Sequence, residues 1–218
     1  LGASLVLLGH TRDDQAEQVL LGLVRGSGAR SLAGMPSVRG IFRRPLLGVT
    51  RGDTRSLCEA ANLPWWDDPM NDDPAYLRVK ARRALADLEG DLGPGIREAL
   101  ARTADQLRED ADHLDALADA AYATLHPVER EQIAGEGPPS PAICSLSTGG
   151  LAELPRAVRT RVWRRLLIAA GAPAGQVSAR HTDDCDRLLT DWHGQGPIHV
   201  PGDLRVSRSG GRIVLAPG

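Results

Sequence analysis

The stretch Leu5-Val6-Leu7-Leu8-Gly9-His10-Thr11-Arg12-Asp13-Asp14-Gln15-Ala16-Glu17 decides the fold. Its first four residues form an apolar run without alternation, which is typical of a buried parallel strand with a functional loop at its carboxyl end. Thr11 stands three residues before Asp14 and predicts a capping box at the start of a helix. That helix is amphipathic, because apolar residues recur at helical spacing, at Ala16, Val19, Leu20, Leu23 and Val24. Strand, loop and helix in this order predict part of an α/β sheet.

Length and composition exclude several classes of protein. The chain has 218 residues, of which 42% are hydrophobic and 25% charged, and its formal net charge is −2. These values are typical of a globular protein. No run of about 18 apolar residues occurs, so we expect no membrane span and no membrane partner. Cys58, Cys144 and Cys185 form no Cys-x-x-Cys pair, which predicts reduced thiols in a cytoplasmic protein and argues against a zinc site; we assign no residue as a metal ligand.

The small net charge conceals an uneven distribution. Residues 1–83 and 120–218 are basic, whereas residues 84–119 are strongly acidic. Arginine presents a planar fork of donors that suits phosphate. The densest clusters are Arg43-Arg44, the segment 78–83, and the row Arg156, Arg159, Arg161, Arg164 and Arg165. A nucleic-acid surface and an ordinary solvated surface explain these clusters equally well.

Helical periodicity and turn residues outline the rest of the chain. We expect helices over residues 50–61, 76–88, 96–125, 154–170 and 179–192. The tail alternates as strands do, with Gly210-Gly211 as the turn of a hairpin. Gly93-Pro94-Gly95 is the best candidate for a domain boundary. The predicted fold is therefore an α/β domain over residues 1–92, followed over residues 93–218 by a mainly α-helical domain with a short terminal β-hairpin.

Two groups of residues could carry chemistry, and the first is a pair of acids. Asp14 and Glu17 are three residues apart, so both carboxylates project from neighbouring positions in the first turns of the helix. Such a pair could bind Mg²⁺ through water, hold an ammonium group or take a proton from it. Acids in a first helical turn also simply complement the helix dipole. His10, at the end of the strand, strengthens the functional alternative.

The second group is Arg25-Gly26-Ser27-Gly28. Two glycines let backbone amides approach a phosphate closely, and Arg25 adds positive charge. A helix C-cap followed by a turn explains both glycines equally well. The sequence leaves these two alternatives open.

Several short motifs follow one another along the chain. The first is Gly9-His10-x-x-Asp13-Asp14-Gln15-Ala16-Glu17. The next are Arg25-Gly26-Ser27-Gly28, Leu32-Ala33-Gly34-Met35, Arg44-Pro45-Leu46-Leu47, Leu63-Pro64-Trp65 and Asn71-Asp72-Asp73-Pro74-Ala75-Tyr76. In this order and spacing the motifs resemble the tRNA(Ile)-lysidine synthase family, and the resemblance is specific over residues 4–105. Beyond these residues, the outline and the turn Val200-Pro201-Gly202-Asp203 resemble the tRNA-binding domain of the family.

The resemblance implies a fold, a reaction and partners. Residues 1–92 would be the carboxyl-terminal part of a PP-loop catalytic domain, which is Rossmann-like and of the adenine nucleotide alpha hydrolase type. Residues 93–218 would bind tRNA. Members of the family use ATP and Mg²⁺ to adenylate C2 of the wobble cytidine in a tRNA(Ile) with a CAU anticodon, and free lysine then displaces AMP to give lysidine. The family suggests a monomer or a homodimer.

The resemblance also implies roles for individual residues. Asp14, Glu17 and His10 are the expected catalytic residues, with the two carboxylates holding and deprotonating lysine. The expected nucleotide- and phosphate-binding residues are Arg25, Gly26, Gly28 and Arg44, and the expected tRNA-binding residues are Arg78, Lys80, Arg82 and Arg83. Arg78 and Arg82 are also candidates to stabilise charge on the reacting phosphates. The family usually has Arg-Asn-Arg-x-Arg-His at residues 78–83, and the asparagine and histidine are replaced here.

The ATP-binding motif of the family, Ser-Gly-Gly-x-Asp-Ser, does not occur in the 218 residues. We therefore expect a chain that lacks the amino-terminal part of the catalytic domain and does not adenylate tRNA alone. Two alternatives stay open. One is a related tRNA-modifying ATP pyrophosphatase that transfers sulfur, although the absence of Cys-x-x-Cys pairs counts against it. The other is a non-catalytic tRNA-binding module.

Overall fold

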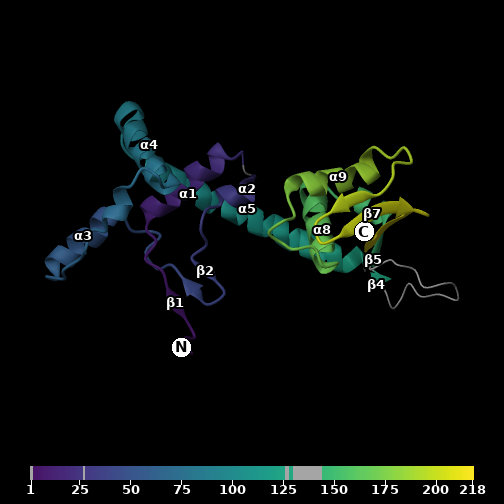
Figure 1. Cartoon of the computed structure of the whole chain (residues 1–218), viewed down its shortest axis with the longest axis horizontal. Coiled ribbons are helices and arrows are strands. Elements are labelled where there is room, and N and C mark those ends of the chain that lie inside the picture. Colours follow the sequence, from purple (N-terminus) through teal and green to yellow (C-terminus); the bar gives the residue numbers. More distant parts are fainter. Residues whose placement is uncertain (1, 27, 126–127, 130–143) are drawn as a thin grey trace. The chain divides into compact units, whose positions relative to one another are not determined.

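The computed structural model describes residues 2–26, 28–125, 128–129 and 144–218. The chain divides into two compact units, Leu1–Ala111 and Asp112–Gly218, which follow each other from purple to yellow in Figure 1. Within the described residues, no helix is long and apolar enough to cross a membrane.

Helix α5 (Ile96–Leu125) is the longest helix of the described chain and confirms the helix predicted over residues 96–125. The two units divide inside this helix. The domain boundary predicted after residue 92 coincides with the end of α4 (Leu77–Leu92) and falls within the first unit. A boundary between domains at this position stays a prediction.

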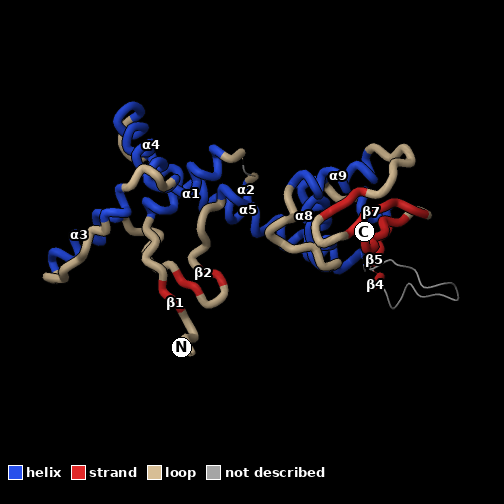
Figure 2. Tube along the Cα trace, in the orientation of Figure 1, coloured by secondary structure: helices blue, strands red, loops and turns tan. Residues whose placement is uncertain are grey.

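The first unit begins with a three-stranded mixed sheet in the order β1-β3-β2 (Figure 2). Strand β1 (Val6–Leu7) is parallel to β3 (Phe42–Arg43), and β2 (Val38–Arg39) is antiparallel to β3. A parallel pair needs a crossover connection, and here it contains α1 (Arg12–Val24) and the short α2 (Ala29–Leu32). The predicted α/β organisation is confirmed at the level of a mixed sheet with helices.

The first strand is shorter and more exposed than predicted. The buried strand predicted over residues 5–8 is a two-residue strand, and the side chains of Leu5 and Leu7 are 46% and 66% exposed. In the part of the chain that the structure describes, β3 is the only element against which β1 packs extensively. The prediction of burial was wrong because an apolar run shows which residues are hydrophobic but not whether a layer covers them.

Helix α1 packs against α4, and this contact forms the core of the first unit. The apolar residues that the two helices bury include Ala16, Val19, Val79, Ala81 and Leu85. The predicted capping box is present at the start of α1. Oδ2 of Asp14 accepts hydrogen bonds from the backbone N–H and the hydroxyl of Thr11, at 2.8 and 2.9 Å. The box therefore fixes both the first turn of α1 and the orientation of Asp14.

Two further elements lie between β3 and α4. Helix α3 (Arg51–Ala60) also begins with a capping box, in which Oδ2 of Asp53 accepts from the backbone N–H and the hydroxyl of Thr50. These hydrogen bonds hold the pKa of Asp53 below its usual value. A 3-10 helix, η1 (Pro69–Asp72), precedes α4.

A buried glutamine ties the loop after α2 to α1. Oε1 of Gln15 accepts from the backbone N–H of Met35 at 2.7 Å, and Nε2 donates to the carbonyl of Met35 at 3.1 Å. Gly34 has a φ of +62°, and a Cβ added there would lie 2.6 Å from Oε1 of Gln15. Both facts require glycine at this position. The loop continues through β2 and β3 and brings Arg44 to the end of β1.

The second unit contains a five-stranded antiparallel sheet in the order β4-β5-β8-β7-β6. In that order the strands are Val128–Glu129, Cys144–Ser147, Arg212–Pro217, Leu204–Ser209 and Ile198–Val200. The predicted terminal hairpin is present as β7 and β8, which turn at Gly210-Gly211. The expectation of a hairpin alone was wrong. Strands β4 and β5 pair with residues far along the chain, and β6, which pairs with the neighbouring β7, has only three residues, so no local pattern marks these strands.

Helices α7 (Thr148–Ala152), α8 (Arg156–Ala169) and α9 (Ala179–Thr190) complete the second unit. Helix α8 packs on α9, and α9 contacts β6 and β7. The fully buried side chains of the core include Trp163, Leu166, Val206, Ile213 and Leu215. Buried and exposed residues alternate over the first half of β7, so one face of the sheet meets this core and the other turns away.

The three cysteines are free thiols, as the sequence predicts. Cys185 is fully buried in the second unit, and burial, with the nearby charges of Asp184 and Asp186, raises its pKa to about 12. A thiol that stays protonated in this way is chemically unreactive.

A buried ion pair joins α8 to α9. Arg159 donates from Nε to Oδ1 of Asp186 at 2.6 Å and from Nη2 to Oδ2 at 3.0 Å, and Nε1 of Trp163 donates to the same Oδ1 at 3.0 Å. Burial acts against the charged form of Asp186, but the hydrogen bonds from Arg159 and Trp163 and the charge of Arg159 outweigh it and lower the pKa of Asp186. The carboxylate therefore stays ionised inside the unit.

The other arginines of α8 are also engaged within the second unit. Arg164 donates to the backbone carbonyls of Ala174 and Val177. The remaining ion pairs are Arg156 with Asp183, Arg161 with Asp115, and Arg165 with Asp119. The sequence left open whether this row of arginines faces phosphate or solvent. In the structure the row links α8 to the elements around it.

Asp186→Asn tests how much the buried pair contributes. We expect the free energy of unfolding to fall by about 3–5 kcal/mol, because Arg159 is left buried without its counter-ion. Urea denaturation followed by tryptophan fluorescence measures the change. The matched control is Asp183→Asn. It removes the acid that pairs with Arg156, in an ion pair between the same two helices that is more exposed than the pair of Arg159 and Asp186. This variant should lower the free energy of unfolding by less than about 1 kcal/mol. Equal losses in the two variants would contradict the prediction.

Candidate active site

The acid pair, Asp14 and Glu17, lies in the first turns of α1, and arginines surround its first member. While Oδ2 of Asp14 closes the capping box, Oδ1 lies 3.5 Å from Nη2 of Arg51 and 3.8 Å from Nη1 of Arg78. Both oxygens of Asp14 therefore have partners within the first unit.

Glu17 is almost fully buried, with 1% of its side chain exposed. Oε1 accepts a hydrogen bond from Nε of Arg82 at 2.8 Å. Oε2 has no partner, and among the described residues it is the only buried side-chain nitrogen or oxygen in that condition. A buried carboxylate oxygen without a hydrogen bond is unfavourable, so this oxygen is a candidate acceptor for a donor group that the chain itself does not supply.

His10 and Arg44 lie at the end of β1, next to Asp14. Nε of Arg44 donates to Nδ1 of His10 at 3.2 Å, and Nη1 of Arg44 donates to the carbonyl of Pro36 at 2.9 Å. Partial burial lowers the pKa of His10, and the charges of Arg44 and Arg78 lower it further, although Asp14 acts in the opposite direction. His10 is therefore neutral at pH 7. Because Nδ1 accepts a hydrogen bond, the proton of the ring lies on Nε2.

Helix α4 supplies arginines that face the acid pair. Arg78 and Arg82 are four residues apart and project from the same side of α4, so each reaches one of the two carboxylates. Lys80 is exposed, and Arg83 donates to the carbonyl of Asp72 at 2.9 Å. Of the four residues predicted to bind tRNA, the structure brings two to the acid pair. The binding of tRNA by all four stays a prediction.

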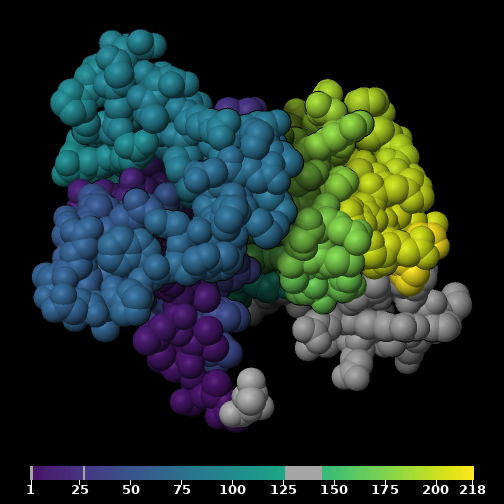
Figure 3. Space-filling view, turned by 60° about the vertical axis from the view of Figure 1, so that its left-hand side comes forward, coloured from purple at the N-terminus to yellow at the C-terminus, as the bar shows by residue number. Residues whose placement is uncertain are grey.

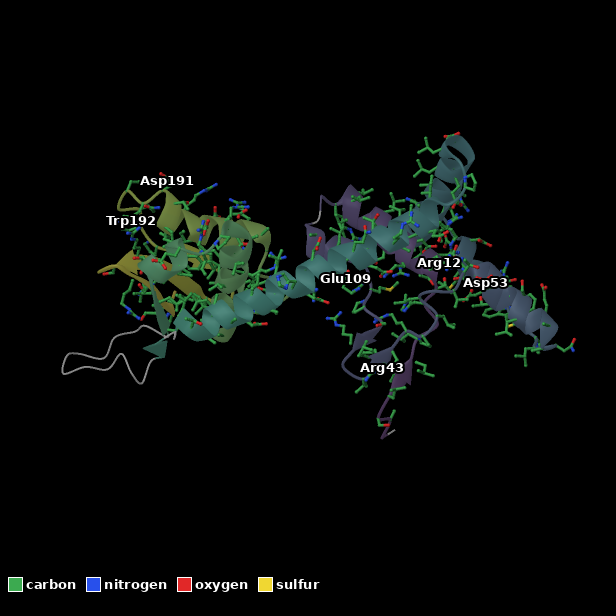
Figure 4. The ribbon with its side chains drawn as sticks, turned by 180° about the vertical axis from the view of Figure 1, so that it is seen from behind. Arg12, Arg43, Asp53, Glu109, Asp191 and Trp192 are labelled. Atoms are coloured by element: carbon green, nitrogen blue, oxygen red, sulfur yellow. The ribbon has the colours of Figure 1, made fainter. Side chains whose placement is uncertain are left out.

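No motif in the sequence pointed to Arg51, which also faces the acid pair. Arg51 is the first residue of α3, and its backbone N–H donates to Oδ2 of Asp13 at 2.8 Å. This bond satisfies an amide that the first turn of a helix leaves open. Thr50 marked the start of α3 in the sequence, but no local signal shows that this end meets the start of α1. Figure 4 labels Arg12 and Asp53, which lie at these two helix ends.

A cleft of about 580 Å³ opens beside the acid pair in the first unit. Arg51 and Arg82, which pair with the two carboxylates, both line the cleft. The rest of its wall comes from α3, η1 and the segment between them, and includes Cys58, Trp65, Asp67, Asp68 and Asn71. The cleft is large enough for a small ligand, and its lining carries charges of both signs.

The predicted phosphate loop lies at the other end of α1. Arg25 is roughly 16 Å from Asp14 along the helix axis, at about 1.5 Å per residue. Gly26 has a φ of +63°, and its N–H donates to the carbonyl of Leu23 at 2.9 Å, as expected for a turn. Gly28 caps α2, and position 27 lies outside the described residues. The structure does not bring Arg25, Gly26 and Gly28 to the acid pair, and their binding of a nucleotide stays a prediction.

The acid pair does not fit a directly held Mg²⁺ ion. Hydrogen bonds or ion pairs engage every oxygen of the pair except Oε2 of Glu17. Mg²⁺ needs several oxygen ligands in octahedral geometry. Within the ranges that the structure describes, no three His, Cys, Asp or Glu side chains come together as a metal-ligating group.

Comparisons with known proteins bear on both units. The family model of the PP-loop domain matches residues 1–89, and the model of the TilS substrate binding domain matches residues 146–214. The first match contains the acid pair and the arginines that face it. The second match contains α8, α9 and most of the antiparallel sheet.

Curated relatives match nearly the whole chain. The chain is 50% identical over 221 residues to the tRNA(Ile)-lysidine synthase of Streptomyces coelicolor, which covers 100% of this chain and 59% of the relative. It is 52% identical over 218 residues to that of Thermobifida fusca, which covers 98% of this chain and 62% of the relative. It is 46% identical over 204 residues to the tRNA(Ile)-lysidine synthase of Mycobacterium tuberculosis, and this match covers 93% of the chain and 59% of the relative. The chain belongs to the tRNA(Ile)-lysidine synthase family.

The chain spans 59–62% of the length of these three lysidine synthases. The resemblance inferred from the motifs is therefore confirmed. Every site residue predicted from the sequence, from His10 to Arg83, lies within the PP-loop match.

Arg82→Met tests whether the burial of Glu17 depends on its arginine. We expect the free energy of unfolding to fall by about 3–5 kcal/mol, because the variant leaves a buried carboxylate without a counter-ion. The double variant Glu17→Gln/Arg82→Met should recover most of this loss, since a neutral amide needs no counter-ion. Urea denaturation of the unsubstituted chain, Glu17→Gln, Arg82→Met and the double variant measures the coupling.

The control for this cycle is Arg55→Met, which removes the exposed ion pair with Asp67 in the same unit. It should cost less than about 1 kcal/mol, because solvent screens exposed pairs. A double variant as unstable as Arg82→Met alone would contradict the proposed dependence of Glu17 on Arg82.

The titration of His10, followed by NMR, tests the charges around it. Its pKa should lie below the usual histidine value, should rise in Arg44→Met and should fall further in Asp14→Asn. The unfolded chain takes up this proton at higher pH than the folded chain. The contribution of His10 to stability is therefore complete above the usual pKa of histidine and is lost as the pH falls through the folded value. Shifts of the opposite sign would contradict this arrangement.

Proposed function

We propose that this chain is part of an enzyme that uses ATP to join lysine to C2 of the wobble cytidine in a tRNA(Ile) with a CAU anticodon, which forms lysidine. One observation carries the proposal. In the PP-loop match, Glu17 is buried with Oε2 free of partners, and the cleft beside it is lined by Arg51 and Arg82. The names of the relatives, which match nearly all of the chain, support the same reaction.

The chemistry of lysine explains why such a carboxylate is needed. An ammonium group cannot act as a nucleophile until it has lost a proton. We assign the removal of this proton to Oε2 of Glu17, because it is the one oxygen of the acid pair without a partner. The neutral amine then forms a bond to C2, the bond from C2 to the adenylated oxygen breaks, and AMP leaves with the electron pair. Asp14 is a positioning residue, because it holds Arg51 and Arg78.

Arginines near the end of β1 supply the positive charge that adenylation requires. Negative charge accumulates on the phosphorus oxygens and on the leaving pyrophosphate. Arg44, Arg51 and Arg78 lie around His10 and Asp14, and the neutral His10 adds an N–H donor. We assign these groups to the reacting phosphates. Mg²⁺ would be bound by the phosphates of ATP, since the acid pair does not fit it.

Two residues of α4 are left for the tRNA. The side chain of Lys80 is exposed and has no hydrogen bond or ion pair among the described residues, and the guanidinium of Arg83 has donors left beyond its bond to the carbonyl of Asp72. A cation on an exposed helix face suits the sugar–phosphate backbone. We therefore retain Lys80 and Arg83 as contacts of the tRNA near the catalytic residues.

Incorporation of lysine into tRNA tests the proposed reaction. Residues 1–218 are joined to a segment of a family member that carries Ser-Gly-Gly-x-Asp-Ser, and a tRNA(Ile) transcript with a CAU anticodon is supplied with ATP and radiolabelled lysine. The joined protein should label the tRNA, whereas the 218 residues without that motif should not. Glu17→Gln should lower the rate by about 10²–10⁴-fold, which is the usual contribution of general base catalysis.

The matched control is Glu59→Gln, which neutralises an exposed acid on α3 and should leave the rate unchanged. Labelling that is equally fast in Glu17→Gln would contradict the role of Glu17. No labelling by the joined protein, combined with transfer of sulfur to the tRNA, would contradict lysidine synthesis itself.

A further inference from the structure

One face of the antiparallel sheet in the second unit carries basic and hydroxyl side chains. The register places them together. His199 on β6 pairs with Arg205 on β7, and Ser207 and Ser209 follow at alternate positions along β7. Arg212 on β8 pairs with Ser209. We call these five residues, His199, Arg205, Ser207, Ser209 and Arg212, the basic sheet face.

The basic sheet face turns away from the core of the second unit. Leu204 and Val206, the neighbours of Arg205 along β7, are buried in that core, so the side chain of Arg205 projects from the opposite side. His199, Arg205 and Ser209 are exposed, and the other two residues are half-buried. Figure 3 shows residues of the carboxyl-terminal strands, in yellow, at the surface of the second unit.

The positive charges on this face are not neutralised by acids. Among the described residues, the side chain of Arg205 has no hydrogen bond or ion pair. Arg212 donates from Nε to the hydroxyl of Ser145 at 3.0 Å and from Nη2 to the carbonyl of Ser145 at 3.4 Å, both on the neighbouring β5. Neither contact removes the charge of Arg212, so both guanidiniums remain available to an anion.

The helical side of the unit differs in this respect. Every arginine of α8 and α9 is engaged by an acid or by backbone carbonyls. The acids whose side chains are described in the unit lie outside its strands, at Asp112, Asp115, Asp119, Glu153, Asp183, Asp184, Asp186, Asp191 and Asp203. The arginines of the sheet therefore keep more of their charge available to a polyanion than the paired arginines of the helices do.

The two arginines lie far enough apart to contact different parts of an extended anion. Arg212 lies on the strand next to Arg205 and four positions along from the residue that pairs with Arg205, so the two Cα atoms are about 14 Å apart, at about 3.3 Å per residue and 4.8 Å between strands. This spacing allows the two side chains to contact separate phosphates of one nucleic-acid backbone.

We propose that the basic sheet face binds the sugar–phosphate backbone of the tRNA, a proposal that rests on the proposed function. Arg205 and Arg212 contact separate phosphates, and the hydroxyls of Ser207 and Ser209 are suited to the 2′-OH groups or phosphate oxygens between them. A contact with the sugar–phosphate backbone positions the RNA but carries no sequence information directly.

Salt-dependent binding of the 218-residue chain to a tRNA(Ile) transcript with a CAU anticodon tests this assignment. Arg205→Gln should weaken binding about tenfold, as expected for the loss of one hydrogen bond to a charged group. The slope of log affinity against log salt should fall by about one in magnitude, because one phosphate contact is lost. Arg205→Lys keeps the charge and should retain the slope. The matched control is Arg180→Gln, since the side chain of Arg180 is 88% exposed on α9 of the same unit.

The outcomes separate this proposal from the proposed function. If the unsubstituted chain binds tRNA and the two variants, Arg205→Gln and Arg180→Gln, have equal affinities and slopes, tRNA binding by the basic sheet face is overturned. The proposal of lysidine synthesis is not affected by that result. A failure of the unsubstituted chain to bind any tRNA would overturn both. A tRNA with another anticodon should lose affinity to the same extent in Arg205→Gln, and a loss confined to the CAU anticodon would overturn the backbone contact.

Discussion

A carboxylate buried between two helices is the constraint on which the first unit depends. Glu17 lies in the contact of α1 with α4, where an ionised group is stable only beside a counter-ion. Arg82 supplies that charge at 2.8 Å and so constrains how the two helices face each other. With the same facing, Arg78 reaches Asp14. One oxygen of Glu17 stays unsatisfied, which lowers stability but leaves an acceptor for a ligand.

The second unit uses the same chemistry for a different purpose. Asp186 is also buried beside an arginine, but Arg159 and Trp163 together satisfy both of its oxygens. Each oxygen of Asp186 therefore has a partner, and the pair joins α8 to α9. Oε2 of Glu17 differs, because it is buried without a hydrogen bond.

Much of the fold was predictable because its signals are local. The capping box of Thr11 and Asp14, all six helices expected from periodicity and the terminal hairpin are present. The burial expected for residues 5–8 was wrong, and most of the five-stranded sheet was missed, because both depend on what packs or pairs from elsewhere in the chain. Arg51 was missed for the same reason, since its helix end meets α1 only in the folded unit.

The sequence by itself determined where helices begin, which residue types stand at the acid pair, and, through the order of its motifs, the family. Only the tertiary structure decided which arginines meet which carboxylates. The row on α8 was the densest arginine cluster of the carboxyl-terminal half, yet acids and carbonyls engage it, whereas the isolated Arg205 keeps its charge available. The physical reason is that an ion pair depends on distances of a few ångströms between segments far apart in the chain. No local pattern of residues contains those distances.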